Sequence, residues 1–453
     1  MANDSETGLR RWLARIVAVR PGELQALLWS FAYFFFLLAG YYVLRPVRDE
    51  MGIAGGVRNL QWLFTATFFV MLAAVPLYGA VVARLPRARF IPLVYHFFVA
   101  NIVIFWLLLT LDIGRVHVAR VFFVWISVFN LFAVSVFWSF MADLFAAEQG
   151  KRLFGFIAAG GSAGALVGPA VTVGLAVPLG PANLLIVAAV LLEVAVLCAL
   201  RLERAAARRG KQPVAVPAVA APVGSPPTSP LGGGWLAGIT LLLRSPYLAG
   251  IALWVALLAL AGTFLYFEQA NIVAAASEDP AVRTRIFATI DLAVGMLTII
   301  VQLLVTGRLI TRYGVGPAAG FLPVVFAAGF VALAVSPALA VVIAFQAIQR
   351  TANFAISNPA REVLFTVVTR EEKYKAKNVI DVVVFRGADA VSGWLFAMMR
   401  TVGLELQAIS LAVVPVMAAW LALALGLGRA QERRARHSAM HASAERKPTA
   451  KGA

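Results

Sequence analysis

Runs of about twenty apolar residues follow one another along most of this 453-residue chain. That is the length at which an α-helix crosses the hydrocarbon core of a bilayer, so each run predicts one membrane-spanning helix. Overall, 61% of the residues are hydrophobic and 13% are charged, whereas a soluble domain is about half apolar and about a quarter charged. The sequence therefore predicts an all-α membrane protein.

Twelve runs are long enough to span a membrane. The first is too long for the apolar core of a secretory signal peptide and lacks a small-residue cleavage site, so it is predicted to be the first helix. The predicted helices are 24–44, 60–83, 90–111, 118–144, 153–177, 183–200, 246–276, 286–310, 317–335, 338–365, 378–399 and 404–427.

The basic residues are distributed unevenly between the two sides of the membrane. With twelve spans, 29 of the 39 Lys and Arg residues fall on the side that holds both termini, and 8 fall on the other. Because positive residues favour the cytoplasmic side, we expect cytoplasmic termini and a location in the cell (inner) membrane. The net charge of +17 lies in loops and tails, and no nucleic-acid-binding motif is present, so nucleic acid is not an expected partner.

A polar segment, residues 201–234, separates the first six predicted helices from the last six. It is basic at first and then rich in Pro, Ala and Gly, a composition typical of a flexible linker. The expected organisation is a cytoplasmic segment 1–23, six-helix halves 24–200 and 235–428 around this cytoplasmic linker, and a disordered basic tail 429–453 against anionic lipid.

A weak internal repeat supports two related halves. Residues 37–40 read Leu-Leu-Ala-Gly, and residues 259–262, 222 positions later, read Ala-Leu-Ala-Gly. A lysine lies ten residues before a glycine in both 151–161 and 377–387. Parallel halves of this kind predict a 6+6 pseudo-symmetric bundle of the major facilitator type, which is an arrangement of secondary transporters.

Ionisable residues inside predicted spans are the first candidates for function, since a charge in the bilayer is costly. Arg45 and Arg48 follow the first predicted helix and share a face if that helix continues through Pro46. They form an anion clamp at a central cavity in one interpretation. In the other, they mark the end of the helix and lie among lipid headgroups. Pro46 permits a break in the helix here, which would free backbone groups to line a cavity.

Two acidic candidates lie elsewhere. Asp143 closes the fourth predicted helix, and it either serves the substrate or pairs with Lys151 or Arg152 on the cytoplasmic side. Glu268 lies deep in the seventh predicted helix, where a functional role is favoured over a structural one.

The tenth and eleventh predicted helices are the most polar of the set. A helix that faces lipid does not tolerate so many polar groups, so these side chains are expected to face a cavity or one another. Internal ion pairs, such as Arg386 with Asp389, are the structural alternative. The candidates for substrate binding or coupling here are Arg350, Asn358, Arg361, Glu362, Asp381 and Arg386.

Other chemistry has little support in the sequence. Glycines 160, 164 and 168 form a small-residue stripe that predicts close helix packing. The chain contains no phosphate-binding loop of an ATP-driven pump, no histidine spacing of a metal site and no nucleophile–base set. We therefore expect neither an enzyme nor a cofactor.

Several of these stretches resemble the ATP/ADP translocase family of plastids and intracellular bacteria, a divergent major facilitator branch. Residues 44–49 (Leu-Arg-Pro-Val-Arg-Asp) are similar to its Leu-Arg-x-x-Lys-Asp, and residues 137–143 to its Phe-Trp-x-x-Ala-Asn. Residues 358–362 (Asn-Pro-Ala-Arg-Glu) resemble its Asp-Pro-x-Lys-Glu, and residues 377–382 its Gly-Lys-Ala-x-x-Asp-Val. Glu268 is similar to its helix 7 glutamate.

This resemblance implies exchange of nucleotides or other phosphorylated anions. We expect a monomeric carrier that works by alternating access. Arg48, Glu268 and Arg361 would then be linked to substrate binding or coupling. One alternative is a proton-coupled carrier of another organic solute that uses Glu268 or Asp381. Another is a membrane scaffold or sensor that transports nothing, although its spans would not need so many polar residues.

Overall fold

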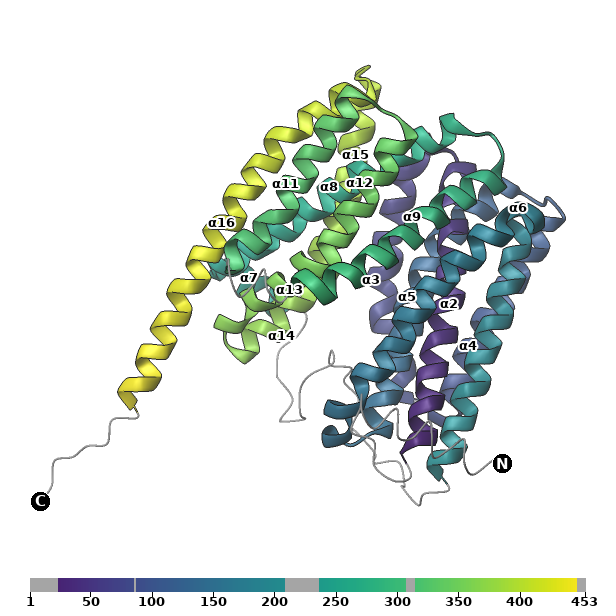
Figure 1. Ribbon diagram of the computed structural model, residues 1–453, viewed down its shortest axis with the longest axis horizontal. Helices are drawn as coiled ribbons and strands as arrows, with labels where there is room; N and C mark the ends of the chain where they lie inside the picture. The colour runs from purple at the N-terminus through teal and green to yellow at the C-terminus, as the bar shows by residue number, and fades with distance from the viewer. Residues whose placement is uncertain (1–22, 85–86, 208–235, 307–313, 446–453) are drawn as a thin grey trace, which may run out of the picture. The chain divides into compact units, whose positions relative to one another are not determined.

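The computed structural model describes residues 23–84, 87–207, 236–306 and 314–445, which form helices joined by short turns and contain no β-strand (Figure 1). Eleven described segments are long and apolar enough to cross a membrane. One of them, Arg152–Ala205, has 54 residues and is interrupted at Gly180, whose φ of 76° breaks the helix. Because 54 residues suffice for two crossings, the segments account for the twelve predicted helices.

The chain divides into two compact units. Unit 1 contains α2 (Leu24–Ala54), η1 (Val57–Asn59), α3 (Leu60–Arg84) from Phe69 onward, α4 (Arg87–Thr110), α5 (Arg115–Leu144), α6 (Ala147–Ala207) and the start of α9 (Pro280–Val301) up to Leu292.

Unit 2 contains the first residues of α3, Leu60–Phe68, and the described chain from Leu236 onward except for Ser277–Leu292. Its helices besides the rest of α9 are α7 (Leu236–Arg244), α8 (Pro246–Ala276), α11 (Val315–Val335), α12 (Leu339–Ala352), α13 (Asn358–Leu364), α14 (Arg370–Asn378), α15 (Phe385–Thr401) and α16 (Leu406–Glu445). Three π-helical segments, η2 (Gln302–Thr306), η3 (Asn353–Ser357) and η5 (Val379–Val384), and one 3-10 turn, η4 (Phe365–Val367), connect some of them.

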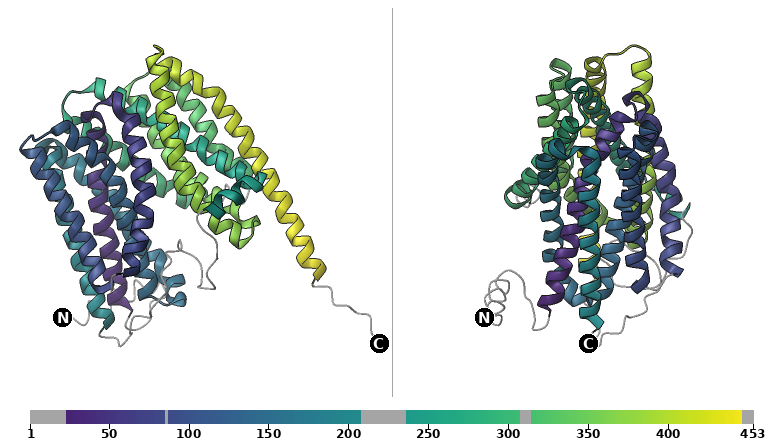
Figure 2. Two further views of the ribbon diagram at one scale, coloured as in Figure 1. Left: turned by 180° about the vertical axis from the view of Figure 1, so that it is seen from behind. Right: turned by 90° about the vertical axis from the view of Figure 1, so that its right-hand side faces the viewer.

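In unit 1, α2 and α6 lie side by side over much of their lengths (Figure 2). Gly160, Gly164 and Gly168 make this contact possible. A Cβ on any of them would overlap a backbone carbonyl oxygen of α2, of Phe31, Phe35 or Ala39 respectively. The predicted packing role of the glycine stripe is confirmed, since only the smallest residue allows two helix backbones to approach so closely.

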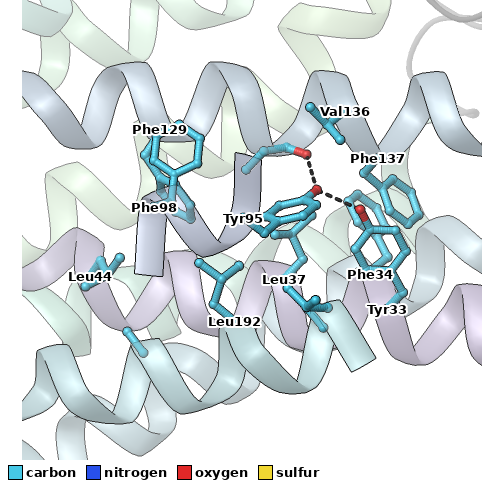
Figure 3. Packing of buried hydrophobic residues seen from close by; sticks show 14 of the residues in the cluster. Tyr33, Phe34, Leu37, Leu44, Tyr95, Phe98, Phe129, Val136, Phe137 and Leu192 are labelled. Carbon is cyan, nitrogen blue, oxygen red and sulfur yellow. Dashed lines mark hydrogen bonds between the residues drawn. The ribbon is translucent and has the colours of Figure 1, made fainter. Parts of the chain in front are cut away.

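The core of unit 1 is aromatic and includes one buried polar pair (Figure 3). The Tyr33 hydroxyl donates to the Tyr95 hydroxyl over 2.7 Å, and Tyr95 donates to the Ala133 carbonyl over 3.0 Å. Phe34 and Phe137 stack with ring centroids 4.1 Å apart. Each buried hydroxyl thus has a partner, as burial in an apolar interior requires.

In unit 2, α16 runs along α11 (Figure 1) and also contacts α8. Trp254, Trp420 and Phe326 meet in the buried centre, where the Trp254 and Trp420 ring centroids are 5.7 Å apart and those of Phe326 and Trp420 are 5.9 Å apart. Gly316 and Gly428 lie together where α11 crosses α16. The unit is therefore held by large aromatic side chains at its centre and by close backbone contact at one end.

Three predicted features differ in the structure. The first helix does not end at Leu44 but continues through Pro46 to Ala54. The tenth and eleventh helices are not regular, because η3 and η5 interrupt them. The tail is not disordered from residue 429, since α16 remains helical to Glu445. Residues 1–22, 208–235 and 446–453 lie outside the described part, and with them most of the predicted linker.

Candidate functional site

The first group of candidate residues lies on α2 in unit 1. Pro46 lacks a backbone N–H and so removes one helical hydrogen bond, yet the helix continues, and Arg45 and Arg48 are three residues apart on it. The Arg45 Nη1 atom lies 3.6 Å from Asp291 Oδ1 on α9. The Arg45 guanidinium also lies 5.8 Å from the ring centroid of Tyr42.

Arg48 has a different environment from Arg45. Its Nη1 atom lies 3.1 Å from Asp49 Oδ1, and its guanidinium carbon lies 4.0 Å from the centroid of the Phe123 ring on α5. A guanidinium against an aromatic face is a favourable cation–π contact. The two arginines are therefore brought to one end of α2 but are held by separate partners.

The structure adds an ion pair that the sequence analysis missed. Glu50 on α2 is fully buried and accepts from Arg283 Nε over 2.7 Å and from Nη2 over 2.8 Å. This bidentate geometry is the strong form of an arginine–carboxylate pair. Extending the first predicted helix past Pro46 would have placed Glu50 inside it, but no signal in the sequence connects Glu50 with Arg283.

Asp143 lies in the last turn of α5 and is half-buried. One of the basic residues suggested as its partner, Arg152, binds another carboxylate, because its Nη2 atom lies 3.0 Å from Glu23 Oε1. Gln149 also donates to Glu23, over 2.9 Å.

The densest group of candidates lies in unit 2, beside the two π-helical segments η3 and η5. Arg361 Nη1 lies 3.2 Å from Asp381 Oδ1. This approach is not an aligned hydrogen bond, since Asp381 Oδ1 and Arg361 Nε are buried without hydrogen-bond partners among the described residues. Such π-helical turns occur frequently at functional sites, and here one precedes Arg361 and the other contains Asp381.

The neighbouring residues of this group are also paired. Lys377 Nζ donates to both oxygens of Glu362, over 2.6 and 2.7 Å.

Asn358 and Arg350 are half-buried on the helical stretch that contains Arg361. One Arg361 donor and the buried polar atoms Asn353 Oδ1, Ser357 Oγ and Thr351 Oγ1 have no partner in the described chain.

Arg386 forms the internal ion pair that was the structural alternative for it. Its Nη1 atom donates to Asp389 Oδ2 over 3.3 Å, and the other Asp389 oxygen accepts from Thr263 on α8 over 2.9 Å. The predicted i,i+3 pair is confirmed. It links α15 to α8.

Glu268 lies on α8 with 1% of its surface exposed. Its Oε1 atom accepts a hydrogen bond of 2.7 Å from the Ser410 hydroxyl on α16. The next residue, Gln269, accepts from Gln346 on α12, and Gln346 accepts from Gln349 over 2.7 Å. Two adjacent α8 residues thus connect to different helices, and this chain of buried amides was not anticipated as a unit.

A metal site finds no support in the described residues, where no three His, Cys, Asp or Glu side chains gather closely enough to hold an ion. The candidate chemistry is instead that of arginine. Its guanidinium binds carboxylate and phosphate in a bidentate manner.

The chain matches no known family model and no curated protein. It is similar in structure to a bacterial homologue of the iron transporter ferroportin in an inward-facing state, with a TM-score of 0.61, 13% identity, and 90% of this chain and 98% of that chain covered. It is also similar to a point mutant of the nucleoside transporter NupG, with a TM-score of 0.57, 14% identity, and coverage of 91% and 99%.

A third similar structure is a bacterial homologue of the human lysosomal transporter Spinster, inward-facing and unoccupied, with a TM-score of 0.56, 15% identity, and coverage of 91% and 99%. These neighbours are membrane transporters. At such low identity the likeness shows the fold. The chain has the multi-pass, all-α membrane fold of these structures.

Proposed function

We propose that this chain is a secondary transporter that exchanges nucleotides or other phosphorylated anions by alternating access. The fold supports the transport part of the proposal, because the similar structures carry the names of transporters. Alternating access exposes one substrate site to the two sides of the membrane in turn. We further propose that the protein lies in the inner membrane. The distribution of Lys and Arg favours cytoplasmic termini there.

The observation that carries the substrate class is the state of Arg361. Its side chain is 17% exposed and lies inside a membrane-spanning segment, and its buried Nε donor has no partner among the described residues. Its nearest carboxylate, on Asp381, approaches without the alignment of a hydrogen bond. Arg361 therefore has N–H donors that are not used in aligned hydrogen bonds to a carboxylate. A phosphate group could accept two such hydrogen bonds from one guanidinium in a bidentate manner.

The acidic neighbours suggest how the site stays balanced without substrate. Asp381 faces Arg361, and Glu362 holds Lys377. A phosphate that enters displaces the Asp381 carboxylate from Arg361, and the carboxylate returns when the substrate leaves. This arrangement suits exchange of substrates, because the Arg361 guanidinium always faces an anion, either the substrate phosphate or the Asp381 carboxylate.

A thermal-shift experiment tests the substrate class. Purified protein is melted with ATP, ADP, inorganic phosphate or uncharged adenosine. We expect the phosphorylated compounds to raise the melting temperature and adenosine to have little effect. Arg361→Ala should abolish the shift, whereas Arg400→Ala, at an exposed residue that binds the Leu404 carbonyl, should retain it. Equal shifts with adenosine and ATP, or no shift at all, would contradict the assignment.

A further inference from the structure

Apart from the exposed Glu432 on α16, the described membrane-spanning segments of unit 2 contain four acidic residues, and Glu268 differs from the other three. Glu362 pairs with Lys377, Asp381 lies against Arg361, and Asp389 pairs with Arg386. Glu268 instead receives its hydrogen bond from the uncharged Ser410. It is also the most completely buried of the four, with 1% of its surface exposed.

The helices packed against α8 bring no cation to this carboxyl group. Arg386 and Asp389 on α15 form an ion pair with each other, and Asp381 Oδ1 in η5 lies 3.2 Å from Arg361 Nη1. Arg350 on α12, Arg244 on α7 and Arg434 on α16 form no ion pair with Glu268 in the described chain, and Arg434 stacks on Tyr247 at the opposite end of α8. The adjoining start of α3, Leu60–Phe68, contains no ionisable residue.

A charged carboxylate in this position would be unfavourable. Burial away from water penalises an ionised carboxylate strongly unless a cation offsets it, and a group without one becomes neutral instead. A single hydroxyl donor does not replace a cation. Glu50 in unit 1 illustrates the contrast, because that buried carboxylate accepts hydrogen bonds from Nε and Nη2 of Arg283.

We propose that Glu268 is a proton-binding site, with Ser410 as its positioning residue, and that it couples transport to a pH gradient. The Ser410 hydroxyl donates to Oε1, and a proton taken from water binds Oε2, which turns the carboxylate into a neutral carboxyl group. The same proton leaves when the site becomes hydrated in another conformation. The coupling part rests on the proposed transport function, whereas the proton site does not.

Infrared spectroscopy of the reconstituted protein at neutral pH tests the proton site without any substrate. We expect a protonated-carboxyl band that shifts in D2O, disappears in Glu268→Gln and moves in Ser410→Ala, which removes the hydrogen bond to the carbonyl oxygen. The matched control is Glu193→Gln, at a membrane carboxylate whose side chain is 39% exposed and lies near His96. It should retain the band. Superimposable spectra of wild type and Glu268→Gln would overturn the proposal.

Transport measurements test the coupling. Vesicles loaded with ATP are given labelled ATP with and without an inside-alkaline pH gradient. The wild type should take up more label with the gradient. Glu268→Gln, checked by thermal melting to be folded, should exchange label at the same rate with and without the gradient. An unchanged response in Glu268→Gln would overturn the coupling. If the wild type transports no labelled ATP, ADP or phosphate, the transport proposal and the coupling both fail, and the infrared result alone decides the proton site.

Discussion

Arg361 Nη1 and Asp381 Oδ1 lie 3.2 Å apart in unit 2. Arg361 follows the π-helical segment η3, and Asp381 lies within another one, η5. Ion pairs between arginine and aspartate are common in proteins. The pair lies within membrane-spanning segments, and the Arg361 Nε donor has no hydrogen-bond partner in the described chain. The pair is therefore the first place to test by substitution.

Arg361→Ala should raise the KM for ATP by about tenfold or more, because hydrogen bonds to charged groups contribute about 1.5–3 kcal/mol. Asp381→Asn should lower the KM, since it removes the anion that competes with the substrate. The double variant should behave like Arg361→Ala. Initial rates of labelled ATP uptake measure all three. An Asp381→Asn effect that persists without Arg361 would show that the two residues act independently.

The ion pair of Glu50 with Arg283 should stabilise unit 1. Removing one partner of a buried pair leaves an uncompensated charge, which costs about 3–5 kcal/mol, so Glu50→Gln should lower the melting temperature clearly. The control is Arg285→Gln, at an exposed residue on the same helix as Arg283. Fluorescence-detected melting in detergent makes the comparison, and similar melting of the two variants would mean that the pair contributes little.

The glycine stripe of α6 gives a matched pair of substitutions in one helix. Gly164→Ala places a Cβ against the Phe35 carbonyl, whereas Gly174→Ala meets nothing within 4 Å. We expect the first to destabilise the protein by about 1–3 kcal/mol through overpacking. The second should stabilise it by about 0.5–1 kcal/mol, because alanine favours a helix more than glycine does. Melting temperatures that change equally in both variants would contradict the packing argument.

The parts of the fold that depend on local pattern could be predicted from the sequence. The helix Pro246–Ala276 was expected with the bounds that it has, since a long apolar run between a proline and a polar loop leaves little choice. The close contact made by Gly164 was likewise expected, because small residues four apart share one helix face.

Features that depend on distant partners could not be predicted. Glu50 and Arg283 are 233 positions apart, and no local pattern connects them. The π-helical turns at Asn353–Ser357 and Val379–Val384 leave no periodic signature, because one widened turn barely disturbs the spacing of apolar residues. That Ser410 lies opposite Glu268 depends on how α16 packs against α8, which hydropathy does not encode.

Counterflow in reconstituted vesicles tests the central claim most directly. Labelled ATP is offered to vesicles that contain the wild-type protein and either unlabelled ATP or buffer alone. We predict that label accumulates in the loaded vesicles, well above protein-free vesicles and above those filled with buffer. Equal label in loaded vesicles with and without the protein, for ATP, ADP and phosphate alike, would contradict exchange of phosphorylated anions.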